Sequence, residues 1–257
     1  MTMRQPKCGT DARCEGCWPD CGYPSDDVPE LVSGDKLIFI LAFMKVVNGL
    51  LITLEGIDGS GKSTAIRNIA AKLKELVPER TLLITAEPSN SAAGRILRSE
   101  ILRESTGELS FAEHMEELFL FMADHARHLA DTIIPSLEAG VIVLCDRYAD
   151  STAAYQGVTL KGIVPDPLVW IREIYRPWNL RPDRTLLFLL DPQLSVQRIS
   201  SRSGREKFER QDFLRQVDGN FRRLASLEPE RFVIIDASLD EDAVAESAVS
   251  SMLEMLT

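Results

Sequence analysis

A single segment, Gly56–Thr64, constrains the fold of this chain more than any other feature. It reads Gly-Ile-Asp-Gly-Ser-Gly-Lys-Ser-Thr and matches the phosphate-loop pattern G-x-x-x-x-G-K-[ST] in full. An apolar run precedes it and a helical pattern follows it, which is the context that the motif requires. Glycines let the backbone N–H groups face inward, and the helix N-terminus adds positive potential at the same point. We therefore predict nucleotide binding.

The residue types in this loop have distinct chemical tasks. Lys62 has the length and charge to reach the β- and γ-phosphates, and the Ser63 hydroxyl is a ligand for Mg²⁺. Many protein families share the loop, so it does not by itself define the reaction. The expected nucleotide-binding residues are Gly56, Ile57, Asp58, Gly59, Ser60, Gly61, Lys62, Ser63 and Thr64.

The rest of the chain alternates apolar runs with helical patterns. The runs predict strands over Leu50–Leu54, Thr81–Thr85, Val141–Cys145, Thr185–Leu190 and Phe232–Ile235. The predicted helices are Lys62–Val77, Gly94–Arg103, Phe111–Ala139, Pro167–Tyr175, Leu194–Ser201, Phe213–Leu227 and Glu241–Met255. Pro135 is expected to kink or break the longest of them. Near-continuous apolar strands predict an α/β fold in which a five-stranded parallel sheet has helices on both faces. Ligands of such sheets bind outside the carboxyl ends of the strands.

Composition narrows the range of partners. The chain has 257 residues, of which 45% are hydrophobic, so it has enough apolar surface for a large core. Its formal net charge of −10 argues against a nucleic-acid partner, although a few local cations can still hold one phosphate. We find neither a membrane-spanning run nor a secretory leader and expect a cytoplasmic protein without a membrane partner.

Four cysteines lie close together near the start of the chain, at Cys8, Cys14, Cys17 and Cys21. Cys14 and Cys17 have zinc-ligand spacing, but no second pair of this kind occurs. We therefore expect residues 1–43 to be a flexible extension, or an appended segment if Met44 is the true start. Residues 44–257 form the predicted phosphate-loop domain. The fifth cysteine, Cys145, ends an apolar run and is expected to be buried and inert.

The strand that ends at Cys145 leads into Asp146-Arg147-Tyr148. An acidic residue at this place in phosphate-loop proteins often helps to hold Mg²⁺, and Arg147 has the geometry to clamp a phosphate. A plain ion pair at the start of a loop explains the same residues. The wider pattern decides between these readings. Glu87-Pro88, then Phe121 within a long helix, then Asp146-Arg147-Tyr148 and Ser151-Thr-Ala-Ala-Tyr-Gln-Gly157 follow the phosphate loop in order.

This ordered set resembles the thymidylate kinases, a family of nucleoside monophosphate kinases that phosphorylate dTMP with ATP and Mg²⁺. The resemblance covers residues 46–257 and implies a homodimer and a role in dTTP biosynthesis. It implies that Asp58 contacts the acceptor region, that Arg98 and Arg147 hold the acceptor phosphate, and that Phe121 stacks on thymine. Asp146 joins Ser63 as a metal ligand. The acceptor residues implied are Glu87, Arg98, Phe121, His125, Arg147, Thr152, Tyr155 and Gln156.

Two segments depart from the family pattern, and a third completes it. His125 stands where the family usually has an arginine that hydrogen-bonds thymine, so we expect His125 or Arg127 to serve the base instead. The loop over Val158–Asp166 is also longer than usual. A basic stretch at about 201–211 is expected to be a mobile lid over the triphosphate. The expected catalytic residues are Arg205 and Lys207 of this lid, together with Asp58, Lys62 and Arg147.

Two other functions remain open at this stage. A related nucleoside monophosphate kinase or deoxynucleoside kinase with a different base preference has the same fold, but a nucleoside kinase needs a base near the 5′-hydroxyl. A phosphate-loop switch or motor ATPase has no use for the Asp-Arg-Tyr and Tyr-Gln-Gly segments. Transfer from ATP to dTMP is the prediction that uses all of these segments.

Overall fold

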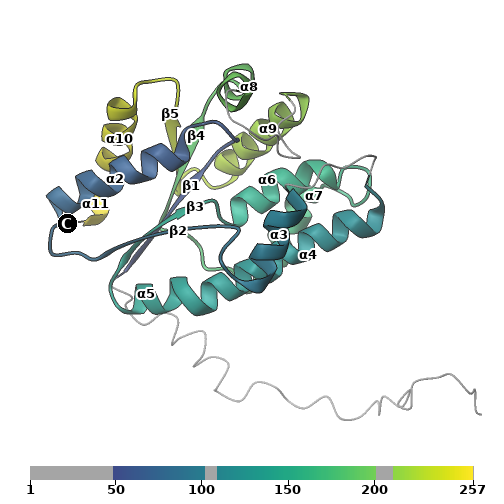
Figure 1. Ribbon diagram of the computed structural model, residues 1–257, viewed down its shortest axis with the longest axis horizontal. Coiled ribbons are helices and arrows are strands. Elements are labelled where there is room, and N and C mark those ends of the chain that lie inside the picture. The colour runs from purple at the N-terminus through teal and green to yellow at the C-terminus, as the bar shows by residue number, and fades with distance from the viewer. Residues whose placement is uncertain (1–48, 102–108, 201–210, 257) are drawn as a thin grey trace, which may run out of the picture. The chain divides into compact units, whose positions relative to one another are not determined.

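A five-stranded sheet forms the centre of the computed structural model, and every pair of neighbouring strands is parallel (Figure 1). The strand order is β2-β3-β1-β4-β5. The strands are β1 (Leu50–Glu55), β2 (Leu82–Ala86), β3 (Ile142–Asp146), β4 (Arg184–Leu189) and β5 (Phe232–Asp236). All five predicted strands are present with ends shifted by one residue at most. The predicted fold class is confirmed.

The structure describes residues 49–101, 109–200 and 211–256, which belong to one unit spanning Val46–Thr257. The predicted N-terminal extension, residues 1–43 with four cysteines, lies outside the described residues. So do the predicted lid cations Arg205 and Lys207 and the last two residues of the helix predicted over Gly94–Arg103. No helix of the described part is long and apolar enough to cross a membrane.

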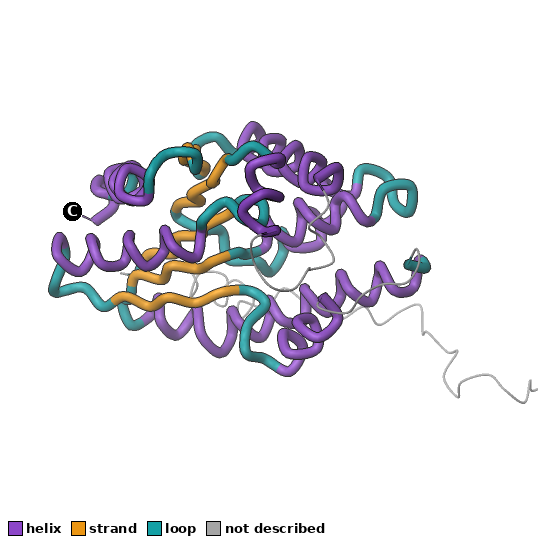
Figure 2. The backbone as a smooth tube through the Cα atoms, turned by 45° about the horizontal axis from the view of Figure 1, so that its top comes forward, coloured by secondary structure: helices purple, strands orange, loops and turns teal. Residues whose placement is uncertain are grey.

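Helices cover both faces of the sheet because successive strand residues point to opposite sides (Figures 1 and 2). On one face, Ile52 and Leu54 pack with α2 (Lys62–Leu76) and α10 (Glu241–Ser250). On the other face, Leu51 belongs to a larger apolar cluster. The helices of that cluster are α4 (Phe111–His128), α5 (Ile134–Glu138), α6 (Ala149–Thr159), α7 (Pro167–Tyr175), α8 (Pro192–Ser200) and α9 (Gln211–Leu227). The remaining helices are α3 (Ala92–Ile101) and α11 (Leu253–Leu256).

Pro135 changes the long predicted helix without ending it. The α-helical turns of α4 give way to a π-helix, η1, over Leu129–Ile133, and α5 follows with Pro135 in its first turn. Proline cannot donate to the carbonyl four residues earlier, and its ring crowds that carbonyl. The wider π turn accommodates the ring. The hydroxyl of Ser136 donates to the Thr132 carbonyl at 2.7 Å within the same segment.

Helix α6 is absent from the predicted elements. Nearly every residue of α6 is buried, from Ala149 to Val158, because the helix packs against both α7 and α9. A helix enclosed on all sides has no alternation of apolar and polar faces, so its sequence carries no helical period. The long loop predicted from Val158 accordingly begins only after Thr159. The predicted last helix, Glu241–Met255, is also divided by a turn after Ser250.

Candidate active site

The phosphate loop connects β1 to α2 in a conformation that only glycine adopts easily. Gly56, Gly59 and Gly61 all have positive φ angles, at 139°, 75° and 86°. A Cβ atom on Gly56 would also lie 2.5 Å from the carbonyl oxygen of Phe188. These glycines therefore allow the loop to wrap tightly against β4.

Lys62 lies inside this loop. Its buried Nζ donates to the carbonyls of Gly56 and Ile57 at 2.9 and 3.0 Å. Burial, followed by the nearby charge of Arg147, lowers the pKa of Lys62 to about 8. Nζ also lies 3.4 Å from Ser60 Oγ, so the ammonium is held by neutral oxygens of the loop itself and is available to a phosphate that enters it.

Two oxygen-bearing side chains meet where α2 begins and β3 ends. The Ser63 hydroxyl donates to Asp146 Oδ2 at 3.1 Å. The other carboxylate oxygen of Asp146 is buried and has no hydrogen-bond partner in the described part of the chain. A carboxylate and a hydroxyl are the hard oxygen donors that Mg²⁺ prefers, so this pair fits that ion.

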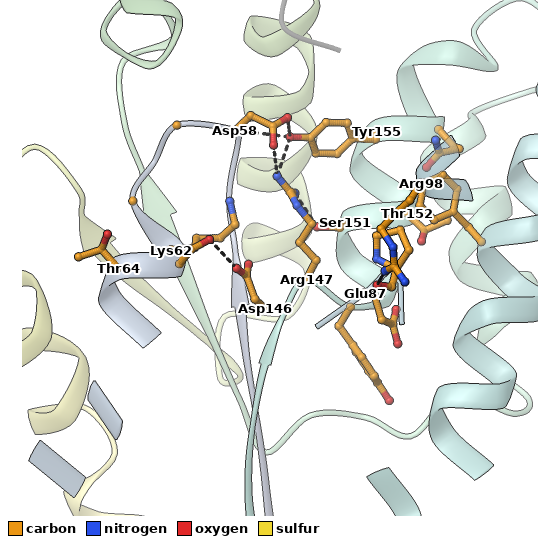
Figure 3. A pocket seen from close by; sticks show the side chains of 17 residues that line it. Asp58, Lys62, Thr64, Glu87, Arg98, Asp146, Arg147, Ser151, Thr152 and Tyr155 are labelled. Atoms are coloured by element: carbon orange, nitrogen blue, oxygen red, sulfur yellow. Dashed lines mark hydrogen bonds and ion pairs between the residues drawn. The ribbon is translucent and has the colours of Figure 1, made fainter. Parts of the chain in front are cut away.

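Arg147 lies at the centre of the site in a strained backbone conformation, with φ at 67° (Figure 3). Its guanidinium pairs with Asp58 and donates to the Gly56 carbonyl at 3.2 Å and to Ser151 Oγ at 3.1 Å. Tyr155 donates to Asp58 Oδ2 at 2.7 Å and lies 3.2 Å from Arg147 Nη2. The arginine is thus oriented from several sides.

The same contacts control the charge of Asp58. Burial acts to raise the pKa of Asp58, but the charges of Arg147 and Lys62 outweigh it and hold that pKa below its usual value. Asp58 is therefore ionised at neutral pH and is the counter-ion of Arg147.

Glu55 and Ser151 support Arg147 and were missed as site residues. Glu55 ends β1 fully buried and accepts from the backbone N–H of Tyr148 at 2.9 Å and from Ser151 Oγ. Burial, with the neighbouring charge of Asp150, raises the pKa of Glu55 to about 8. The sequence feature that could have identified Glu55 is a carboxylate at the end of a mostly apolar strand, directly before the phosphate loop.

One cavity of about 420 Å³ joins the phosphate loop to the residues around Arg98 and Phe121. Most predicted site residues line it: Asp58, Gly59, Gly61, Lys62, Ser63, Thr64, Glu87, Arg98, Phe121, Asp146, Arg147, Thr152, Tyr155 and Gln156. Arg98 enters from α3, where Nη1 donates to the Pro88 carbonyl and Nη2 to Asn90 Oδ1. Phe121 comes from α4, and Thr152, Tyr155 and Gln156 come from α6. Gly56, Ile57 and Ser60 shape the loop without lining the cavity.

His125 does not line this cavity. Its side chain is fully buried, and both ring nitrogens are within hydrogen-bonding distance of protein groups, Glu87 and Asn179. The expected hydrogen bond from His125 to a base is therefore not available in this arrangement. Arg127, the other residue considered, is exposed and pairs with Asp131. The sequence predicted a base-contacting side chain at this position because a residue's place in a helical pattern does not show whether its side chain is buried.

The sequence profile described as "Thymidylate kinase" matches residues 54–248, which include the whole cavity lining. This chain belongs to the thymidylate kinase family. The family resemblance drawn from the motifs is thereby confirmed. The match runs from Leu54, near the end of β1, into α10, so it includes strands β2 to β5 and the phosphate loop.

Relatives support this family assignment over most of the chain. A "Probable thymidylate kinase" of Methanosarcina barkeri is 41% identical over 213 residues, which cover 82% of this chain and 99% of the relative. A protein of the same name from Methanococcoides burtonii is 44% identical over 211 residues, covering 81% and 100%. Another from Natronomonas pharaonis is 42% identical over 208 residues, also covering 81% and 100%.

Proposed function

We propose that this chain transfers the γ-phosphoryl group of ATP to dTMP, which yields dTDP and ADP. The observation that carries the proposal is the single cavity in which Lys62 of the phosphate loop and Arg147 meet Arg98 and Phe121. One end of this cavity has the chemistry of a triphosphate site. The other end has two arginines and an aromatic ring, which suit a nucleotide that already bears a phosphate.

The donor end supplies charge neutralisation. The loop from Gly56 to Thr64 binds the ATP phosphates, and Lys62 exchanges its contacts with Gly56 and Ile57 for phosphate oxygens. Ser63 and Asp146 would hold Mg²⁺, which neutralises negative charge on the phosphates when it is bound. The basic segment near 201–211 is proposed as the lid, with Arg205 and Lys207 contacting the transferred group.

The acceptor end supplies position. Arg147 and Arg98 hold the dTMP phosphate in line with the γ-phosphorus, and Asp58 orients Arg147. Phe121 stacks on thymine. Glu87, Thr152, Tyr155 and Gln156 form the remaining walls around base and sugar. A phosphate dianion is already a competent nucleophile, so the reaction needs no strong general base.

We also propose that the chain works as a cytoplasmic homodimer, in which residues 1–43 are an extension to the catalytic domain 44–257. Helices α3 and α4 pack together and expose Ile96 and Phe119, whose side chains are 49% and 53% exposed. Exposed apolar residues on these two packed helices support self-association through the α3–α4 pair. Light scattering on the purified protein measures the mass of the assembly, and a monomer at micromolar concentration would contradict this proposal.

The test of the activity is coupled ADP release with Mg²⁺-ATP and a panel of acceptors. The panel contains dTMP, dUMP, dCMP, dGMP, UMP, thymidine and no acceptor. We expect strong turnover with dTMP, weaker turnover with dUMP and little with UMP. Turnover with thymidine would assign the chain to the nucleoside kinases. ADP release independent of every acceptor would indicate a hydrolase.

A further inference from the structure

His125 is enclosed by aromatic rings instead of facing the cavity. Its ring centroid lies 4.5 Å from that of Tyr148, 5.1 Å from that of Tyr175 and 5.4 Å from that of Trp178, each in an edge arrangement. The imidazole has no exposed surface. A swing toward the cavity would have to displace these packed rings, so His125 serves the site from behind its wall.

Both ring nitrogens of His125 face oxygen atoms that only accept hydrogen bonds. Nδ1 lies 2.9 and 3.0 Å from the two carboxylate oxygens of Glu87, and Nε2 lies 2.9 Å from Asn179 Oδ1. With the Asn179 amide oxygen facing Nε2, neither partner can donate, so each ring nitrogen carries a hydrogen in this arrangement. The ring that satisfies both contacts is the imidazolium.

His128 provides a contrast within the same cluster. Its Nδ1 lies 2.9 Å from Glu87 Oε1, but its Nε2 lies 2.7 Å from the hydroxyl of Thr85. A hydroxyl can donate, so a neutral imidazole protonated on Nδ1 satisfies both contacts. Glu87 as a carboxylate, His125 as an imidazolium and His128 as a neutral ring give this group of three no net charge, which costs less in a low-dielectric interior than an unpaired buried charge.

The groups around His125 favour its charged form. Burial acts to lower the pKa of His125, but the charge of Glu87 and the hydrogen bonds with Glu87 and Asn179 raise it above its usual value. Burial acts to raise the pKa of Glu87, but His125 and His128 lower it below its usual value. The titratable groups around the Glu87–His125 pair, from all packed elements, are Asp124, His128, Cys145, Tyr148 and Tyr175.

We propose that His125 is a positioning residue, an imidazolium that holds Glu87 and thereby the Glu87–Pro88 wall of the acceptor end. This inference rests on the proposed function. Glu87 and Pro88 both line the cavity, and the Pro88 carbonyl accepts from Arg98, the arginine assigned to the acceptor phosphate. Without the imidazolium, Glu87 loses its charge partner and two donor contacts. Glu87 and Pro88 are then held less firmly in position, and so is Arg98, which donates to the Pro88 carbonyl. The phosphate loop keeps its own contacts.

A spectroscopic experiment tests the protonation state without any substrate. The full chain has three histidines, so a long-range ¹⁵N–¹H spectrum resolves each imidazole. At pH 8 we expect one ring with protons on both nitrogens, and His125→Asn should remove its signals. Glu87→Gln should convert that ring to the neutral form at the same pH. A His125 ring that is neutral at pH 8 in the unmodified protein would overturn the proposal.

A kinetic experiment tests the positioning role. His125→Asn should raise KM for dTMP about tenfold or more, the size expected when a charged hydrogen bond is lost, with kcat changed less than about threefold. KM for ATP should not move. Asn179→Leu removes only the Nε2 acceptor and should shift KM for dTMP in the same direction by less. His114→Asn is the matched control, because His114 lies on the same helix outside the cavity.

The two experiments separate failure of this inference from failure of the proposed function. If the acceptor panel identifies a different monophosphate, the KM comparison is made with that acceptor and the spectrum is unaffected. An unchanged acceptor KM in a folded His125→Asn protein would overturn the positioning role. Equal changes in kcat and in KM for ATP would also overturn it, because they would reveal a general structural effect. If His125→Asn does not fold, Asn179→Leu and the wild-type spectrum still decide.

Discussion

Arg147 forms an ion pair with Asp58, although the two residues lie 89 positions apart in the chain. Parallel pairing of β1 with β3 aligns Leu54 with Asp146, and the backbone N–H of Arg147 donates to the Leu54 carbonyl at 3.0 Å. The loops that follow the two strands therefore begin side by side. This register brings the proposed acceptor arginine against the phosphate loop.

Arg147→Ala should mainly weaken use of the acceptor. We expect kcat/KM for dTMP to fall about 10- to 100-fold, because charge-assisted hydrogen bonds to a phosphate are lost. Coupled ADP release at varied dTMP measures this effect. Arg222→Ala, which removes an exposed arginine of α9, is the matched control. Equal acceptor-dependent turnover in Arg147→Ala and wild type would show that Arg147 does not hold the acceptor phosphate.

Lys62→Ala should abolish transfer. The ammonium is the cation that the phosphate loop holds in place, so its loss should lower kcat at least about 100-fold, as with other preorganised donors. Lys74→Ala, on the exposed face of the same helix, should keep full activity. The same assay measures both variants. A folded Lys62→Ala protein with near-normal turnover would refute the donor site.

Phe121→Ala should reduce affinity for dTMP without affecting ATP. Base stacking on an aromatic ring contributes about 1–3 kcal/mol, which predicts a Kd increase of about 5- to 150-fold. Titration calorimetry with dTMP measures it directly. Phe111→Ala is the control, since Phe111 lies at the exposed start of the same helix and does not line the cavity. Should both variants bind dTMP equally well, Phe121 has no stacking role.

Arg231→Leu should destabilise the fold. The side chain of Arg231 is 5% exposed and donates to both carboxylate oxygens of Asp150, at 2.6 and 3.1 Å. Removal of one partner leaves Asp150 as a buried charge, which costs about 3–5 kcal/mol in the free energy of unfolding. Urea unfolding measures this change. The double variant Asp150→Asn with Arg231→Leu should recover part of the loss, and a double variant no more stable than the single one would contradict the explanation.

Glu228 should contribute stability that depends on pH. Burial acts to raise the pKa of Glu228, but Arg231, Arg172 and Arg181 lower it to about 2, against an ordinary value of 4.5. A lowered carboxyl pKa means that the folded state binds this proton less tightly than the unfolded state does. The stabilisation is therefore complete above pH 4.5 and is lost as the pH falls toward 2.

The variant Glu228→Gln tests this dependence. Its Tm should lie below that of wild type at pH 7, and the difference should shrink as the pH is lowered through 4.5. Glu230→Gln, an exposed neighbour with one ion-pair partner, should show a much smaller difference at every pH. A Tm difference for Glu228→Gln that is constant between pH 7 and pH 3 would show that charge is not the cause.

The sequence by itself determined the phosphate loop and the sheet. The motif from Gly56 to Thr64 needs local backbone geometry only, and apolar runs reveal buried strands directly. Strand ends moved by a residue at most, and Cys145 is buried as expected. The order of the acceptor motifs also sufficed for the family, because several short patterns at fixed spacing carry more information than any one of them.

Tertiary structure decided what each acceptor side chain faces. Residues on α4 such as Phe121 and His125 are one turn apart, yet one lines the cavity and the other is buried among Tyr148, Tyr175 and Trp178. Helix α6 was not predicted because it is buried on all sides, so its sequence lacks the alternation of apolar and polar residues that indicates a helix. Burial and partner choice depend on elements brought together from distant parts of the chain, and a local pattern contains no record of them.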